Sequence, residues 1–254
     1  MITMKGAAVS AKLKEQVEKG LETLTWVPKL TIIRVGENPD DISYEKGATK
    51  KLTSFGLEVE SKVFPGDISD EAFKREFAAI NADASVDGIL MLRPLPKQIN
   101  EQDIEKMIDP AKDLDGISPV NIAKVFSGDT SGFAPCTAEA VVCMLKMNDI
   151  ALSGKRVAVV GRSMVVGRPL SMLLLHENAT VTICHSRTAN LPEVCREADI
   201  LAACVGKAAM INHTYVKKDA VVIDVGINVD ENGKLCGDVD FADLEGTASA
   251  ATPV

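Results

Sequence analysis

The fold of this chain is decided by the stretch Arg156-Val-Ala-Val-Val-Gly-Arg-Ser-Met-Val-Val-Gly-Arg-Pro-Leu170. An apolar strand runs directly into a turn bounded by Gly161 and Gly167, and an apolar helix follows from Leu170 to Leu175. Glycines in such a turn let the backbone approach a pyrophosphate, whose charge is favoured by the free N–H groups and dipole of the helix N-terminus. The stretch therefore predicts a dinucleotide-binding loop. Its glycines do not follow the common G-x-G-x-x-G spacing, so a turn that merely needs glycines is the alternative.

The alternation of strand and helix extends in both directions from this stretch. The runs that predict strands are Leu30 to Val35, Leu57 to Phe64, Val86 to Leu92, Arg156 to Val160, Ala179 to Cys184, Ile200 to Val205 and Val221 to Val225. The runs that predict further helices are Gly6 to Leu24, Ile42 to Phe55, Asp70 to Ile80 and Thr137 to Met147. Strands that alternate with helices predict parallel sheets covered on both faces, so we expect an α/β fold. A cleft between two such domains is the expected place for a small ligand.

The composition excludes several classes of protein. Apolar residues make up 46% of the 254 residues and charged residues 25%, which is typical of a packed globular protein and too apolar for a disordered one. The formal net charge of −8 would repel a phosphate backbone. No apolar run approaches the roughly 18 to 20 residues that span a bilayer, and the first residues lack a signal-peptide pattern. We therefore expect a cytoplasmic protein with neither a nucleic acid nor a membrane as partner.

The cysteines and histidines indicate neither disulfides nor a metal. The six cysteines include no C-x-x-C pair, and four lie in apolar runs, so reduced core thiols are expected. The three histidines, His176, His185 and His213, and the scattered acids never converge at ligand spacing, so no metal site is predicted.

The strand that follows the glycine turn indicates which dinucleotide binds. NAD sites commonly place an acid near the end of that strand, roughly 20 residues on, to bond the ribose 2′-hydroxyl. Here the strand ends in Cys184-His-Ser-Arg-Thr188, with no acid. Ser186, Arg187 and Arg162 instead offer donors or positive charge to a 2′-phosphate, so we predict NADP over NAD. The alternative is that these arginines belong to an ordinary solvated surface.

An ordered set of further motifs is similar to the methylenetetrahydrofolate dehydrogenase/cyclohydrolase family over nearly the whole chain. The motifs are Val35-Gly-Glu-Asn-Pro39 followed by Ser43-Tyr44, Asp87-Gly-Ile-Leu90 running into Pro94-Leu-Pro96, Lys112-Asp-Leu-Asp-Gly116, Pro135-Cys-Thr137, the loop from Gly161 to Pro169, Ala179 to Ser186, and Val222 to Asn228. The resemblance implies an enzyme that oxidises 5,10-methylenetetrahydrofolate to 5,10-methenyltetrahydrofolate, with hydride transfer to NADP. Such a reaction requires little acid–base help, because the cofactor carries the chemistry.

The resemblance also implies two domains. Residues 1–124 are expected to form a folate-binding catalytic domain, residues 125–246 a Rossmann-like NAD(P)-binding domain, and residues 247–254 the start of a C-terminal segment that returns to the first domain. In the family, a tyrosine like Tyr44 packs against the folate, and an aspartate like Asp115 bonds the polar edge of the pterin. Without the resemblance, Tyr44 would be interpreted as a half-buried core ring and Asp115 as a turn residue.

The residues that the resemblance assigns to the sites fall into two sets. The substrate set is Tyr44, Ala48, Met91, Leu92, Arg93 and Asp115, of which Tyr44 and Asp115 are the expected catalytic residues. The cofactor set is Gly161, Arg162, Ser163, Gly167, Ser186 and Ile227. A homodimer is a further expectation that rests on the family alone.

Two positions depart from the family at the second step of the reaction, which hydrates the methenyl carbon to give 10-formyltetrahydrofolate. The family attributes this cyclohydrolase step to a lysine four residues after the tyrosine, where this chain has Ala48. The glutamine that tunes this lysine as a base is replaced by Leu92. Lys46 would point away from the site, whereas Lys51 would lie on the same helix face as Tyr44 but roughly 10 Å from it along the helix axis. We therefore predict that the cyclohydrolase activity is weak or absent.

Three other interpretations stay open. The first is a bifunctional enzyme in which Lys51 or Arg93 has taken over part of the missing chemistry. The second is a non-catalytic folate- or nucleotide-binding protein, against which the complete cofactor loop argues. The third is an unrelated Rossmann-type dehydrogenase, for which the histidines offer no convincing acid–base residue. The family also continues beyond Val254 with a Gly-rich loop and a helix, so we expect that this sequence lacks a C-terminal tail.

Overall fold

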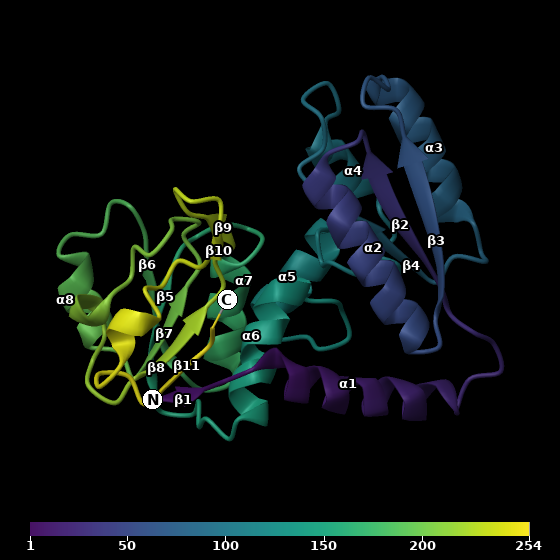
Figure 1. The fold of residues 1–254 in the computed structure, drawn as a ribbon. Helices are drawn as coiled ribbons and strands as arrows, with labels where there is room; N and C mark the ends of the chain where they lie inside the picture. The colour runs from purple at the N-terminus through teal and green to yellow at the C-terminus, as the bar shows by residue number, and fades with distance from the viewer. Residues whose placement is uncertain (254) are drawn as a thin grey trace. The chain divides into compact units, whose positions relative to one another are not determined.

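The computed structural model describes residues 1–253, which fold as two compact units. Residues 1–10 and 135–253 form the unit that we call the six-stranded unit, after its sheet. Residues 11–134 form the other, which we call the three-stranded unit. Figure 1 labels the helices and strands of both units.

A parallel sheet is the centre of the six-stranded unit. Its strands, in spatial order, are β1 (Ile2–Thr3), β11 (Ala250–Ala251), β8 (Val221–Asp224), β7 (Ile200–Ala203), β5 (Arg156–Val160) and β6 (Thr180–Cys184), and every neighbouring pair is parallel. The chain goes from β5 to β6 on one side and then crosses to β7 on the other, so the strand order reverses at β5 (Figure 1). In doubly wound sheets, ligands bind at this reversal, outside the carboxyl ends of the strands.

Both faces of this sheet are covered. The helices of the unit are α6 (Cys136–Met147), α7 (Gly167–His176), α8 (Leu191–Arg196), η1 (His213–Tyr215) and η2 (Ala242–Leu244). On one face, Val157 and Val159 of β5 belong to a core cluster with residues of α6 and α7. On the other face, Leu201 and Ala203 of β7 belong to a cluster with residues of α8, η1 and η2. Successive strand residues point to opposite faces, and both faces are buried, so these strands are continuous apolar runs in the sequence.

A smaller parallel sheet organises the three-stranded unit. Its strands, in spatial order, are β3 (Glu58–Phe64), β2 (Lys29–Val35) and β4 (Gly88–Met91). The helices are α1 (Gly6–Leu21), whose first residues belong to the six-stranded unit, α2 (Pro39–Ser54), α3 (Asp70–Ala82), α4 (Glu101–Met107) and α5 (Pro119–Ser127). The core joins Ile33 and Ile89 of the sheet to Phe73 and Phe77 of α3 and Ile104 of α4. This core holds the carboxyl edge of the sheet in place.

Local sequence explains where two of these helices begin. The side chain of Asn38 accepts a hydrogen bond from the N–H of Asp40 at 3.0 Å, and Pro39 occupies the start of α2, where its missing N–H costs nothing. Ser118 likewise accepts a hydrogen bond from the N–H of Asn121 at 3.1 Å and begins α5. The Asn-Pro turn of the sequence is therefore a helix start and not only a chain reversal.

The predicted α/β class is confirmed, and each strand and helix predicted from the pattern is present with ends that differ by a few residues. The prediction did not include α4, nor α5, which lies in a stretch noted only as acidic and Gly-rich. It also did not include the two-residue strands β1 and β11 or the antiparallel pair β9 (Asn228–Val229) and β10 (Leu235–Cys236). The strands β1 and β11 exist only through long-range pairing with each other and with β8, which a local pattern cannot indicate, whereas β9 and β10 are too short to show a periodic pattern.

The two units divide the chain differently from the expected domains. The expected boundary between residues 124 and 125 falls inside α5, whereas the observed division lies after Ala134. The first residues join the six-stranded unit because β1 pairs with β11. Residues 247–253 also belong to that unit, in which β11 lies between β1 and β8. Val254 lies outside the described residues.

Candidate functional site

The glycine loop after β5 is the first candidate site. Gly161 has a φ of +140°, and a Cβ at this position would lie 2.3 Å from the carbonyl oxygen of Cys204, just after β7. A Cβ on Gly167 would lie 2.3 Å from the carbonyl oxygen of Gly161. Only glycine lets the ends of β5, β7 and α7 approach this closely. A turn that merely needs backbone freedom would not explain Gly167, whose φ is not in the left-handed region.

Ser163 fixes this loop onto the start of α7. Its Oγ accepts hydrogen bonds from the N–H groups of Val166 at 3.1 Å and Gly167 at 3.4 Å, and its carbonyl accepts one from the N–H of Arg168 at 3.0 Å. The loop therefore closes on the N-terminus of a helix, where the dipole favours an anion. This geometry can hold a pyrophosphate.

The other expected cofactor residues lie at the same carboxyl edge of the sheet. β5 and β6 pair in register over their whole length, so Arg162 and Ser186 follow neighbouring strand ends. Both side chains are exposed, as is that of Arg187. Ile227 follows β8 and is 78% exposed, which is unusual for an isoleucine. The fold thus brings the loops that contain Gly161, Ser186 and Ile227 to one edge of one sheet.

A buried carboxylate that sequence reasoning missed organises a further loop at this edge. Asp238 is fully buried and accepts hydrogen bonds from the N–H groups of Val205, Gly206 and Lys207 at 2.5, 3.1 and 2.8 Å. It also accepts one from Nδ2 of Asn228 at 3.0 Å. Its charge is satisfied although it is buried. No sequence signal distinguishes Asp238 from the neighbouring acids, because its backbone donors lie 31 to 33 residues away.

Asp224 and Cys204, also at this edge, have shifted pKa values. Burial raises the pKa of Asp224, against the opposing effect of the backbone N–H groups of Val239, Asp238 and Gly226. Burial, together with the nearby Asp238, raises the pKa of Cys204 to about 12. Cys204 therefore stays a protonated thiol at neutral pH and is not a nucleophile.

The expected folate residues lie at the carboxyl edge of the three-stranded sheet. β2 and β4 are parallel neighbours, so the start of α2 and the turn after β4 leave from the same edge. An isolated parallel bridge joins Ile89 to Asp113 and brings the loop with Asp115 alongside β4. Tyr44, on α2, is 59% exposed. Its ring is therefore not the half-buried core ring of the alternative interpretation.

Asp113 holds the loop that carries Asp115. One oxygen of the buried Asp113 carboxylate accepts a hydrogen bond from the N–H of Ile117 at 3.0 Å, and the other accepts from the N–H of Ser118 at 2.8 Å and from Nδ2 of Asn121 at 2.9 Å. The side chain of Asp115 keeps 24% of its surface exposed. The loop thus leaves the Asp115 carboxylate partly exposed, while the Asp113 carboxylate fixes its shape.

Glu45, the neighbour of Tyr44, ties α2 to the sheet. Nε of Arg34 donates to Oε2 of Glu45 at 2.5 Å, and the two side chains are only 11% and 12% exposed. Burial opposes the charge of Glu45, but the hydroxyl of Ser61 and the guanidinium of Arg34 outweigh burial and lower its pKa. This ion pair fixes the turn of α2 that carries Tyr44.

Arg34→Met is expected to lower the free energy of unfolding by about 3 kcal/mol, because it leaves the buried Glu45 without the cation of its ion pair. Urea unfolding followed by circular dichroism measures this loss. Lys14→Met is the matched control, since Lys14 and Glu18 form an exposed pair whose loss costs at most about 0.5 kcal/mol. Equal losses in the two variants would show that the buried pair has no special role.

The other residues of the expected substrate set are less exposed to solvent than Tyr44. Met91 lies in the core of the unit, and Leu92 is also buried. Ala48 is partly buried in the middle of α2. Nζ of Lys51 lies 5.3 Å from the centroid of the Phe55 ring, near the C-terminal end of α2. Contact of these side chains with a substrate stays a prediction.

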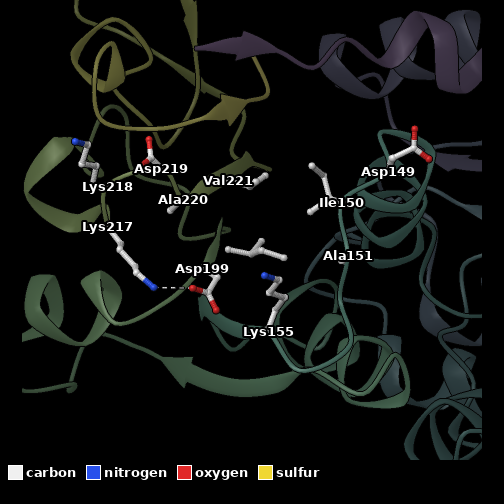
Figure 2. A pocket seen from close by; sticks show the side chains of 11 residues that line it. Asp149, Ile150, Ala151, Lys155, Asp199, Lys217, Lys218, Asp219, Ala220 and Val221 are labelled. Carbon is white, nitrogen blue, oxygen red and sulfur yellow. Dashed lines mark hydrogen bonds and ion pairs between the residues drawn. The ribbon is translucent and has the colours of Figure 1, made fainter.

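A cavity of about 420 Å³ lies at the opposite edge of the six-stranded sheet, where β5, β7 and β8 begin (Figure 2). At its rim, Nζ of Lys217 pairs with Asp199 at 2.6 Å. This contact is the main cause that lowers the pKa of Asp199, and the hydrogen bond from the N–H of Arg156 lowers it further. The cavity faces the amino ends of the strands, so it is not where a doubly wound sheet holds a dinucleotide.

The six cysteines are free thiols, as expected, but only Cys184 and Cys195 are buried in the core, and Cys136 is exposed. Within residues 1–253, no group of three or more His, Cys, Asp or Glu side chains could hold a metal ion. In the same residues, no helix is long and apolar enough to cross a membrane.

Two family models match the chain in succession. Residues 4–115 match the catalytic domain of tetrahydrofolate dehydrogenase/cyclohydrolase, and residues 135–254 match the NAD(P)-binding domain of the same family. The two carboxyl edges described above therefore lie in the segments that correspond to these two domains.

Relatives and solved structures cover the chain from end to end. A protein of Clostridium kluyveri named bifunctional protein FolD is 49% identical over 100% of this chain and 90% of its own length. The structure of the bifunctional enzyme FolD from Campylobacter jejuni has a TM-score of 0.96 and 36% identity, and covers 100% of this chain and 91% of that one. The Trypanosoma brucei methylenetetrahydrofolate dehydrogenase-cyclohydrolase, complexed with NADP and an inhibitor, has a TM-score of 0.92 and 30% identity, with coverage of 100% and 90%.

Proposed function

The chain belongs to the tetrahydrofolate dehydrogenase/cyclohydrolase family, and we propose on that premise that it oxidises 5,10-methylenetetrahydrofolate to 5,10-methenyltetrahydrofolate with NADP. The observation that carries the proposal is the fit of the glycine loop to a dinucleotide. A Cβ at Gly161 or Gly167 would lie 2.3 Å from a backbone carbonyl oxygen, so only glycine allows this tight turn at the strand reversal. NADP, when bound, accepts a hydride at its nicotinamide ring. The residues of the chain hold and orient the reactants.

The three-stranded unit supports the folate half of the proposal. The exposed ring of Tyr44 offers a flat apolar face to a heterocycle, and the partly exposed carboxylate of Asp115 offers acceptors to the N–H groups of a pterin. Neither residue needs to transfer a proton, because hydride loss from the methylene carbon leaves a cation without a base. Rate then depends on holding the donor and acceptor carbons roughly 3 to 3.5 Å apart.

The preference for NADP is proposed to rest on Arg162 and Arg187, which follow neighbouring strand ends. The double variant Arg162→Ala/Arg187→Ala is expected to raise KM for NADP about 30-fold, since each lost charge-assisted contact costs roughly 1 to 2 kcal/mol, and to leave KM for NAD within about twofold. Initial rates with each cofactor measure the split. Arg156→Ala, at the exposed amino edge, is the control. Equal effects on NADP and NAD would remove the assignment of these arginines to the 2′-phosphate.

A second candidate function is the coupled cyclohydrolase, which would convert the methenyl product to 10-formyltetrahydrofolate. The names of the relatives favour it, because the Campylobacter jejuni and Trypanosoma brucei enzymes are named with both activities and the Clostridium kluyveri protein is named bifunctional. The comparisons thus support a bifunctional enzyme better than our expectation of a dehydrogenase alone. One observation argues against the cyclohydrolase activity: the side chains of Ala48 and Leu92 carry neither an amine nor an amide.

Neither candidate replacement for the missing lysine occupies its position on α2. The ammonium of Lys51 lies by the ring of Phe55, near the C-terminal end of α2. The guanidinium of Arg93 is permanently protonated and already faces carboxylates. If hydration occurs, the group that activates water is therefore not at position 48.

One preparation tests the proposal. The purified chain is mixed with 5,10-methylenetetrahydrofolate and NADP or NAD, and absorbance at about 340 nm follows cofactor reduction. Reduction with NADP is expected, at a higher kcat/KM than with NAD. Binding of both ligands without any reduction would instead support a non-catalytic binding protein. An unrelated Rossmann-type dehydrogenase is no longer a candidate, because the family is established. A homodimer stays a prediction for analytical ultracentrifugation.

A further inference from the structure

Arg93 lies among three carboxylates at the carboxyl edge of the three-stranded sheet. Its Nη1 lies 3.4 Å from Oε1 of Glu101 and 3.4 Å from Oε1 of Glu105, and its Nη2 lies 3.5 Å from Oδ2 of Asp115. The side chain of Arg93 is only 17% exposed. The guanidinium therefore joins α4 to the loop that carries the proposed pterin ligand.

The fold fixes this guanidinium from the α4 side. Glu101 and Glu105 are four residues apart on α4, so their side chains share one face of the helix. Oε2 of Glu101 also accepts a hydrogen bond from the N–H of Leu95 at 2.9 Å, which holds the turn after Arg93 against α4. The planar fork of an arginine can face carboxylates on more than one side, which an ammonium does less well. Arg93 is thus anchored at one nitrogen and presents the other to Asp115.

The charge balance of the cluster makes the arginine necessary. Three acidic side chains meet in a space where they are 24% to 30% exposed, and one cation faces all of them. Burial raises the pKa of Glu105, and the charge of Arg93 opposes that rise. Without Arg93, the contact that links the Asp115 carboxylate to the acidic face of α4 would be lost, and with it the orientation that this contact gives to Asp115.

We infer that Arg93 is a positioning residue for the proposed reaction: it orients the Asp115 carboxylate toward the pterin. The inference rests on the proposed function. The family lysine on α2 is absent at Ala48, and the cation of this site comes instead from the turn after β4. Because a guanidinium does not release its proton at neutral pH, Arg93 orients and attracts but does not act as a base.

A double-mutant cycle tests the inference. Arg93→Met, Asp115→Asn and the double variant are compared by kcat/KM for 5,10-methylenetetrahydrofolate at saturating NADP. Arg93→Met is expected to lower kcat/KM about tenfold in the parent, through a higher KM at nearly constant kcat. In the Asp115→Asn background it is expected to change kcat/KM less than twofold, because the residue it positions is already lost. KM for NADP should stay within twofold throughout.

Two more variants separate positioning from general stability. Arg93→Lys keeps the charge without the fork and should recover part of the lost kcat/KM, which also covers the case in which Arg93→Met does not fold. Arg75→Met removes an exposed arginine of α3 and should leave kcat/KM unchanged. A tenfold loss in both backgrounds, or no loss in the parent, would overturn the inference. An inactive parent would overturn the proposed function instead, so the two failures are distinguishable.

Discussion

Gly161→Ala is expected to lower kcat/KM for NADP at least 100-fold, which corresponds to about 2.7 kcal/mol of lost transition-state binding. The added methyl group would lie 2.3 Å from the carbonyl oxygen and 2.7 Å from Sγ of Cys204, and the backbone would have to keep a φ of +140° that side chains rarely adopt. Because the carbonyl belongs to the chain just after β7, relief requires the ends of β5 and β7 to separate. The loop that would hold the pyrophosphate then moves.

The control for this variant is Gly154→Ala. Gly154 also has a positive φ, of +73°, but no atom lies within 4 Å of a Cβ placed there. It therefore carries the conformational cost, roughly 1 to 2 kcal/mol of stability, without the clash. Initial rates and thermal unfolding of both variants measure the difference. If both variants lose activity equally, backbone strain alone explains the glycines, and the cradle described here has no functional role.

Ala48→Lys/Leu92→Gln is expected to accelerate the decay of 5,10-methenyltetrahydrofolate about 100-fold over the parent chain. The two substitutions supply the amine and the amide that the family uses, and a placed general base contributes a factor of this order at the low end. Position 48 is partly buried in α2 and position 92 is buried after β4, so the surrounding residues would restrict the motion of both introduced side chains. The rate is followed at the absorbance of the methenyl compound.

Ala48→Met/Leu92→Met is the matched control, because it adds similar bulk without a base. It should leave the decay rate at the parent level, and thermal unfolding would show whether the polar Gln at position 92 costs stability. A parent chain that already accelerates decay, and a double variant within threefold of it, would contradict this expectation. That result would establish the bifunctional enzyme that the relatives' names favour, with a base other than the residues at 48 and 92.

Much of the architecture could be predicted from the sequence, because its signals are local. The apolar runs of a sheet buried on both faces are continuous, and Asn38-Pro39 marks the start of a helix. The turn between Gly161 and Gly167 indicated a dinucleotide loop before any contact was known. The requirement for glycine at position 161 could not be predicted in this way, because it depends on the close approach of the Cys204 carbonyl after the neighbouring strand.

The parts that could not be predicted depend on distant partners. The two-residue strands β1 and β11 exist because Ile2 pairs with Ala250, at the other end of the chain. Asp238 is buried because backbone donors more than thirty residues away reach it. Arg93 shows the same limit within the candidate site: the sequence places it in the expected substrate set, but it does not indicate the carboxylates around it. Local patterns do not carry such contacts.

The measurement that tests the central claim most directly follows the hydride itself. The chain is supplied with NADP and 5,10-methylenetetrahydrofolate that carries deuterium at both methylene positions, and the reduced cofactor is examined by mass spectrometry. The account predicts NADPH that contains deuterium at C4, formed together with the methenyl product. NADPH without deuterium, or no reduced cofactor from a chain that binds both ligands, would contradict it.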